Sequence, residues 1–93
     1  MSVYVDESIH KYGRMIMCHM FTDSESMGEL HDMARRIGIR RKWFQEHRKL
    51  PHYDVCKSKR ELAIELGAIP CGREKVGEVM EKRRNSKGKG NGL

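Results

Sequence analysis

The sequence predicts a small α/β or α+β domain, with a sheet of three to four strands and two or three helices. A length of 93 residues is typical of a single domain. Short β-branched or aromatic runs alternate with longer stretches in which apolar residues recur at helical spacing. Charged residues make up 34% of the chain and hydrophobic residues 38%, which is typical of a folded domain rather than a disordered one.

Four short segments have the character of β-strands. Val3–Val5 is β-branched and aromatic, and residues 15–21 form an apolar run that is too short for a typical helix. Residues 52–55 alternate between polar and apolar, and residues 69–71 contain a proline, which favours an edge strand. Residues 10–13, which end in a glycine, are expected to form a turn-like connection.

Two Ser-x-x-Glu sequences predict the starts of helices. In this capping box the serine hydroxyl accepts a hydrogen bond from a free backbone amide, and the glutamate reaches back to the first residue of the box. Each box precedes an apolar stripe that ends at a glycine, the residue that most often terminates helices. The boxes and their helices are Ser26 with Glu29 for residues 26–37, and Ser58 with Glu61 for residues 58–66.

The C-terminal part of the chain differs in composition from the rest. A third helix is predicted over residues 73–84, although Gly77 weakens it. Residues 82–93 contain five basic side chains, three glycines and no acidic residue, so we expect a disordered basic tail after a compact domain at residues 1–81. The formal net charge of +6 is mostly a property of this tail.

Cysteine usage and hydropathy indicate a cytoplasmic location. The three cysteines show no close pairing, which favours reduced thiols over a disulfide framework. The first residues of the sequence lack the basic-then-apolar layout of a secretory signal, and no apolar run has the length that a membrane span needs. We therefore expect a cytoplasmic protein that does not contact a membrane.

Polar side chains lie near the ends of the predicted strands. Asp6 follows the first strand, and His19 is near the end of the second. His52 and Asp54 are two residues apart in the third, so both point to one side of it. Because α/β proteins often place functional side chains at strand ends, we expect these four residues to shape a ligand pocket.

A group of basic residues surrounds the start of the second predicted helix. A helix start offers free backbone amides and the positive end of the helix dipole, and neighbouring cations would reinforce both. The group therefore predicts a site for a phosphate or carboxylate, and the alternative is an ordinary cap with surface lysines. Its members are Lys57, Ser58, Lys59 and Arg60.

A second basic group contains an aromatic residue. Arg40, Arg41 and Lys42 directly precede Trp43, and an aromatic side chain among cations is a usual way to stack a base while the cations hold the backbone of a nucleic acid. One alternative is a solvated surface. The other is that Trp43 and Phe44 fill the core, which the small number of aromatic residues favours.

Metal and nucleophile chemistry have weaker support. Asp6, His19, His52 and Asp54 are suitable ligands for zinc or manganese, but no His-x-x-x-His or Cys-x-x-Cys spacing is present, so no metal or other cofactor is predicted. Adjacent residues of a strand face opposite ways, which disfavours a zinc site that uses both Cys18 and His19. A pairing of Cys56 with His52 or His19 is conceivable, but cysteine is more often a small buried hydrophobe. Catalytic residues therefore stay unassigned.

An ordered string of motifs runs along the chain: Val3-Tyr4-Val5-Asp6, Cys18-His19, Glu29-Leu30-His31-x-x-Ala34, Trp43-Phe44-Gln45 and His52-Tyr53-Asp54-Val55-x-x-Ser58-Lys59-Arg60. Over residues 3–70 this string resembles a family of small bacterial and bacteriophage proteins that is known only as a domain of unknown function. The resemblance implies no activity, cofactor or partner, and the basic tail lies outside it. It implies that a polar signature is shared, namely Asp6, His19, His31, His52, Asp54 and Arg60.

These observations favour a small binding module for phosphate-bearing ligands, above all nucleic acid or a nucleotide. Two alternatives stay open. In a metal-dependent phosphohydrolase or nuclease, the histidines and carboxylates would hold a metal that generates hydroxide. A phage-type protein that binds and modulates a host protein would instead present an apolar patch, with the basic tail as an accessory. The sequence does not indicate an oligomeric state.

Overall fold

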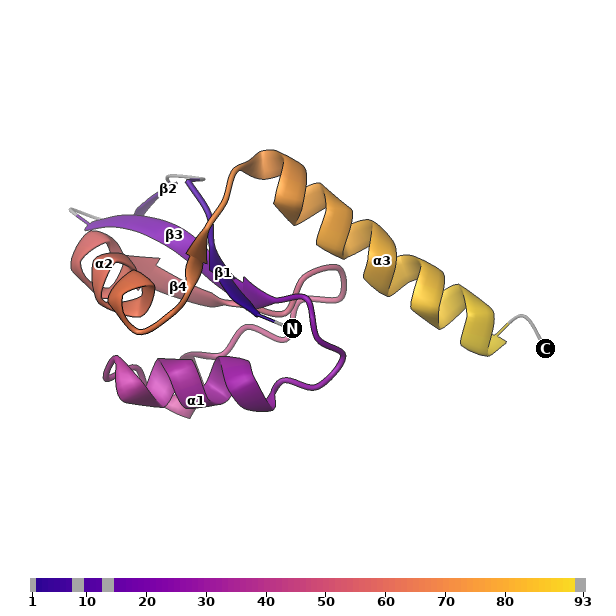
Figure 1. The fold of residues 1–93 in the computed structure, drawn as a ribbon, viewed down its shortest axis with the longest axis horizontal. Coiled ribbons are helices and arrows are strands. Elements are labelled where there is room, and N and C mark those ends of the chain that lie inside the picture. The colour runs from indigo at the N-terminus through magenta and orange to yellow at the C-terminus, as the bar shows by residue number, and fades with distance from the viewer. Residues whose placement is uncertain (1, 8–9, 13–14, 92–93) are drawn as a thin grey trace.

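The computed structural model describes residues 2–7, 10–12 and 15–91, and it has the predicted small α/β fold, with three helices and a mixed sheet (Figure 1). In chain order the elements are β1 (Val3–Val5), β2 (His10–Tyr12), β3 (Met15–Thr22), α1 (Gly28–Arg36), the 3-10 turn η1 (Arg41–Trp43), β4 (Tyr53–Cys56), α2 (Lys57–Glu65), β5 (Ile69–Pro70) and α3 (Arg73–Asn91).

The longest strand, β3, lies at the centre of the sheet. Its residue Met20 pairs with Val5 of β1 on one side and with Tyr53 of β4 on the other, both antiparallel. On the β1 side, β2 pairs with the first residues of β3, and β5 pairs parallel with β1. The part of the sheet that the structure describes is therefore four strands wide, in the order β4–β3–β1–β5, with β2 alongside the start of β3.

The expected turn at residues 10–13 was wrong for His10–Tyr12, which form β2. At eight residues β3 is longer than the three-residue β1, so its first residues need another partner for their backbone groups. The strand β2 supplies it, and residue 13 lies outside the described ranges.

Helices α1 and α2 cover one face of the sheet. Alternate residues of the strands point to this face, as the spacing of two residues requires, and pack with the apolar stripe of α1 into the main core. The intervening residues of each strand therefore point away from this core, toward the other face of the sheet. The buried core residues are Val3, Val5, Cys18, Met20, Leu30, Met33, Ala34, Ile37, Tyr53, Val55, Ala63 and Ala68.

The two helices begin close to where the sequence predicted, but without the capping boxes. Ser26 accepts a hydrogen bond from the amide of Gly28 at 3.3 Å, yet the first helix begins after Met27. Glu29 instead accepts from the hydroxyl of Thr22 at 2.8 Å. Ser58 lies inside the first turn of α2, not before it. The first box was wrong because Glu29 pairs with Thr22, and the second was wrong because α2 begins at Lys57, one residue before Ser58.

Helix α3 lies on the opposite side of the sheet from α1 (Figure 1). A second, smaller core joins it to this face, with Phe21, Leu50 and Val79 buried. The α3 residues in this core are Val76, Val79 and Met80, which belong to the first part of the helix. The molecule is elongated, with extents of 46 × 23 × 22 Å. This face of the sheet is thus less completely covered than the face under α1 and α2.

The sequence suggested a boundary at residue 81, but α3 continues across it to Asn91. Lysine and arginine are good helix formers, and Arg83 donates a hydrogen bond to the carbonyl oxygen of Ser24 at 3.3 Å. Contact with the rest of the domain therefore extends beyond residue 81. Among the helices described, none is both long and apolar enough to span a bilayer.

Candidate functional site

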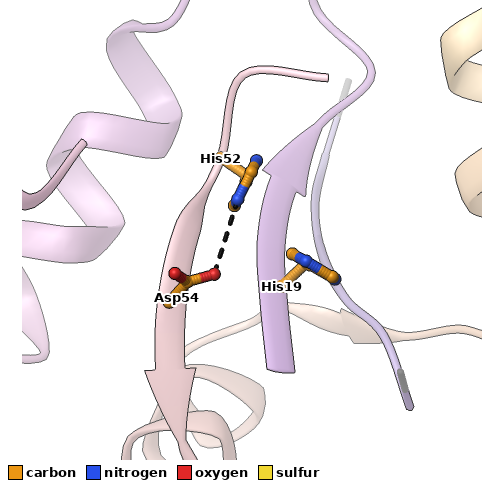
Figure 2. Close-up of side chains that lie close together, drawn as sticks. All are labelled: His19, His52 and Asp54. Atoms are coloured by element: carbon orange, nitrogen blue, oxygen red, sulfur yellow. Dashed lines mark ion pairs between the residues drawn. The ribbon is translucent and has the colours of Figure 1, made fainter. Parts of the chain in front are cut away.

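Three of the predicted site residues come together on strands β3 and β4. His19 pairs directly with Asp54 across the two strands, and residues that pair in this way have side chains on the same face. His52 precedes Asp54 by two residues and so shares that face. Figure 2 shows the three side chains close together: His19 on β3, Asp54 on β4 and His52 directly before β4. We call His19, His52 and Asp54 the His–Asp cluster.

Asp6 contacts both the backbone and the ring of His19. Its side chain is 1% exposed, and its Oδ1 accepts a hydrogen bond from the backbone amide of His19 at 2.8 Å. Its Oδ2 lies 2.8 Å from Nδ1 of the same histidine. The hydrogen bond to Asp6 raises the pKa of His19, and the opposing effect of burial is smaller. This carboxylate therefore fixes the ring of His19 and holds a proton on Nδ1.

His52 is fixed differently. Its Nδ1 lies 2.7 Å from the carbonyl oxygen of Leu50, and because a carbonyl can only accept, Nδ1 is the donor. Its Nε2 lies 3.4 Å from Oδ1 of Asp54, the contact drawn as a dashed line in Figure 2. Burial is the largest cause of a lowered pKa at His52, so this imidazole is mostly neutral at pH 7. The two histidine rings meet edge to face, with 4.7 Å between their centres.

The His–Asp cluster borders a hollow of about 400 Å³ between the sheet and α3, which His19 and His52 line. Each of its three members offers one ligand atom, and these atoms lie within 4.8 Å of one another. Such a set can hold a cation or exchange a proton. The hollow is lined by Asp6, His19, His47, Leu50, His52, Arg73, Val76 and Met80.

A larger hollow of about 1050 Å³ adjoins the first, since His47 and Met80 line both. The loop before β4 provides one wall and α3 the other. Four cations line it, with Glu81 as the carboxylate among the lining residues. We call this hollow the basic groove, after Arg48, Lys49, Arg83 and Arg84.

The contribution of α3 to the site was not predicted. One side of this helix carries Met80 and, three and four residues later, Arg83 and Arg84. That spacing was visible in the sequence, but the residues were assigned to a third helix and a tail. Arg73 at the start of α3 was missed as well, and no signal in the sequence separates it from an ordinary surface arginine.

The residues at the start of α2 that were predicted to bind phosphate do not converge on one site. Lys59 donates to the carbonyl oxygen of Ile37 at 2.7 Å, at the end of α1. Arg60 donates to the carbonyl oxygen of Asp6 at 2.9 Å. Lys57 and Ser58 are exposed. The two half-buried cations thus join parts of the domain, and Arg60 supports the backbone beside the His–Asp cluster.

The residues that were predicted to bind nucleic acid lie on a surface outside the basic groove. Arg40, Arg41 and Lys42 are exposed around η1, and Trp43 is 59% exposed with Nζ of Lys42 5.5 Å from its ring centre. The suggestion that Trp43 fills the core was wrong, because the short 3-10 turn directs it outward. Phe44 does pack against the main core.

The remaining residues that the sequence singled out lie outside the His–Asp cluster and contact other parts of the domain. His31, on α1, lies 2.8 Å from the hydroxyl of Tyr53 under the helical layer. Cys18 is buried in the main core, on the opposite face from its neighbour His19. Cys56 is half-buried, and a hydrogen bond with Ser58 lowers its pKa. All three cysteines are free.

Comparisons with known proteins agree with the resemblance in the sequence. No curated protein and no solved structure matches the chain. A protein family does match residues 3–83, further along the chain than residue 70, so the match takes in the first part of α3. Because the match covers most of the chain, this protein belongs to the family described as "Protein of unknown function (DUF4031)".

Proposed function

We propose that the protein is a binding module for phosphate-bearing ligands, and specifically for nucleic acid. The observation that carries this proposal is the basic groove, where Arg48 and Lys49 face Arg83 and Arg84 across a hollow of about 1050 Å³. Cations gathered around a hollow attract phosphate oxygens. Two of the four come from the loop before β4 and two from α3, so the docking of α3 completes the groove.

The chemistry of the lining side chains suits phosphate. Arginine presents a planar fork of donors that matches two phosphate oxygens at once. Arg83 is also anchored, because its Nη1 donates to the carbonyl oxygen of Ser24 at 3.3 Å, so this guanidinium is held in the wall of the groove. A bound anion would also offset the mutual repulsion of the four cations.

Nucleic acid fits the extent of the basic surface better than a single phosphate does. The groove is open, and a second cationic surface carries the exposed Trp43 beside Lys42. Stacking of a base on an exposed aromatic ring contributes about 1–3 kcal/mol per base. A polymer with repeated phosphates and bases can use both surfaces.

Fluorescence anisotropy with a labelled single-stranded oligonucleotide at two salt concentrations tests the proposal. The groove variant is Arg48→Ala with Lys49→Ala, and the control is Arg36→Ala with Lys57→Ala, which removes the same charge from exposed positions outside the groove. We expect the groove variant to lose at least tenfold in affinity. Its salt dependence should also fall, by about 0.7 in the log–log slope for each lost phosphate contact.

Equal losses in the groove variant and the control would contradict the proposal, because they would mean that binding follows net charge alone. The full chain is needed for this comparison. Truncation after residue 81 would remove Arg83 and Arg84, which line the groove, together with the basic residues beyond them.

A metal-dependent phosphohydrolase or nuclease is the second candidate function. It is favoured by the position of the His–Asp cluster, whose hollow adjoins the basic groove. Cleavage of the same oligonucleotide in the presence of Mn²⁺ or Zn²⁺ would distinguish this function from binding alone. Asp54→Asn should then abolish cleavage and leave oligonucleotide binding unchanged.

A further inference from the structure

We infer that His19, His52 and Asp54 form a binding site for one divalent transition-metal ion of the zinc class. Each residue offers one ligand atom, and the three atoms lie within 4.8 Å of one another. The site is formed by the register of β3 and β4, which sets His19 opposite Asp54. It is independent of the basic groove, since none of its three members lines that groove.

The contact between Asp6 and His19 is the one that metal-binding histidines usually make. Asp6 Oδ2 lies 2.8 Å from Nδ1 of His19 and accepts a hydrogen bond from it, so the proton of the neutral ring is on Nδ1 and its lone pair is on Nε2. In metal sites, a carboxylate in this position orients the imidazole and strengthens it as a ligand. Asp6 also accepts from the backbone amide of His19, so the carboxylate itself is held in place.

His52 and Asp54 present two electron-pair donors to the same point. Nδ1 of His52 donates to Leu50, so the lone pair of the neutral ring is on Nε2, 3.4 Å from Oδ1 of Asp54. Two ligands at about 2.1 Å from a tetrahedral ion lie about 3.4 Å apart. The pair therefore has the separation of two ligands that share a metal.

The donor set decides the class of metal. Two imidazole nitrogens and one carboxylate oxygen suit zinc and its neighbours in the transition series. Calcium and magnesium prefer sites made of oxygen atoms. Three protein ligands leave a coordination position for water or a ligand atom, and two of the three, His19 and His52, line the hollow beneath α3.

A proton competes with the metal for the ring nitrogens of the site. Because histidine binds a metal only through a deprotonated ring nitrogen, metal affinity should weaken in acid.

Isothermal titration of the full chain with Zn²⁺ at pH 7.5, without nucleic acid, tests the inference. We expect one ion per chain, and a loss of at least tenfold in affinity for His52→Gln and for Asp54→Asn. Asp6→Asn should weaken binding by about 10–100-fold, as loss of such a supporting carboxylate does in other metal sites. Two controls should bind as the natural chain does: His31→Gln, under the helical layer, and Cys56→Ser, at the start of α2.

Titration with Co²⁺ gives a second readout, because its absorption spectrum reports the number and type of ligands. Loss of affinity in variants whose circular dichroism and thermal unfolding match the natural chain supports the site. The inference is overturned if Zn²⁺ does not bind, if Asp54→Asn and His52→Gln bind it unchanged, or if Cys56→Ser is the variant that loses it. Because no nucleic acid is present, failure here leaves the proposed function of the groove standing, and the reverse also holds.

Discussion

The two faces of the sheet are built from the same strands but are covered in different ways. On one face, α1 and α2 close an apolar core whose members are almost fully buried. On the other, α3 covers a smaller core and leaves two hollows lined by histidines, carboxylates and arginines. The alternation of side chains along each strand places these two sets back to back, for example Cys18 beside His19.

This difference indicates that the two faces have separate roles. Burial of apolar area supplies most of the folding free energy, so the face under α1 and α2 carries the stability. The face under α3 can then keep polar groups and open space that a tightly packed core would exclude. We propose that the α3 face is the functional face of the protein.

Equivalent methionine truncations on the two faces should have unequal effects on stability. Met33 on α1 is 7% exposed, and Met33→Ala should lower the free energy of unfolding by about 2–5 kcal/mol. Met80 on α3 is half-buried, and Met80→Ala should lower it by about 1 kcal/mol. Urea denaturation of both variants measures the difference. Equal losses would show that both faces contribute alike and would break the comparison.

The two histidines of the His–Asp cluster should change stability with pH in opposite directions. The pKa of His19 is raised above the ordinary value of 6.5, so its contribution is present below pH 6.5 and is lost as the pH rises through the raised pKa. The pKa of His52 is lowered, so the folded state loses stability as the pH falls below 6.5, where the unfolded chain takes up the proton.

Unfolding of the natural chain, His19→Gln and His52→Gln at pH 5.5 and pH 8, with a chelator present, measures both effects. The stability advantage of the natural chain over His19→Gln should shrink at pH 8. Its advantage over His52→Gln should shrink at pH 5.5. If both differences moved in the same direction, the assigned roles of Asp6 and of burial would be incorrect.

Trp43→Ala should have the smallest effect on the fold. The ring is 59% exposed, and exposed substitutions usually change stability by no more than about 0.5 kcal/mol. If the surface around η1 takes part in binding, the same variant should lose affinity for a single-stranded oligonucleotide by about 1–3 kcal/mol. Unchanged affinity would restrict the nucleic-acid interface to the basic groove.

Local patterns in the sequence predicted much of the fold. The apolar runs and stripes predicted β1, β3, β4, α1 and α2 to within a few residues. They also predicted the start of α3, which continues to Asn91 rather than ending at residue 84. They failed where an element or a side chain depends on a pairing that no periodic pattern marks, even between neighbouring segments of the chain. The strand β2 exists because β3 needs a partner for its first residues, and Glu29 leaves its capping role because Thr22 is within reach.

The site was predictable in its residues but not in its geometry. The spacing of His52 and Asp54 placed both on one side of a strand, and strand ends suggested Asp6 and His19. The register of β4 on β3 was not encoded in any local pattern, and a shift of one residue would set an apolar neighbour against His19. The groove depends on how α3 docks through Val79, which is a long-range packing effect.

Nuclear magnetic resonance of the histidine ring nitrogens during Zn²⁺ addition tests the division between the faces most directly. His19 and His52 lie on the α3 face, while His31 belongs to α1 on the other face and contacts Tyr53, so it is an internal control. We predict that one equivalent of Zn²⁺ shifts Nε2 of His19 and of His52 and leaves His31 unchanged. A response of His31 with none at His19 and His52 would contradict the assignment of the α3 face as the functional one.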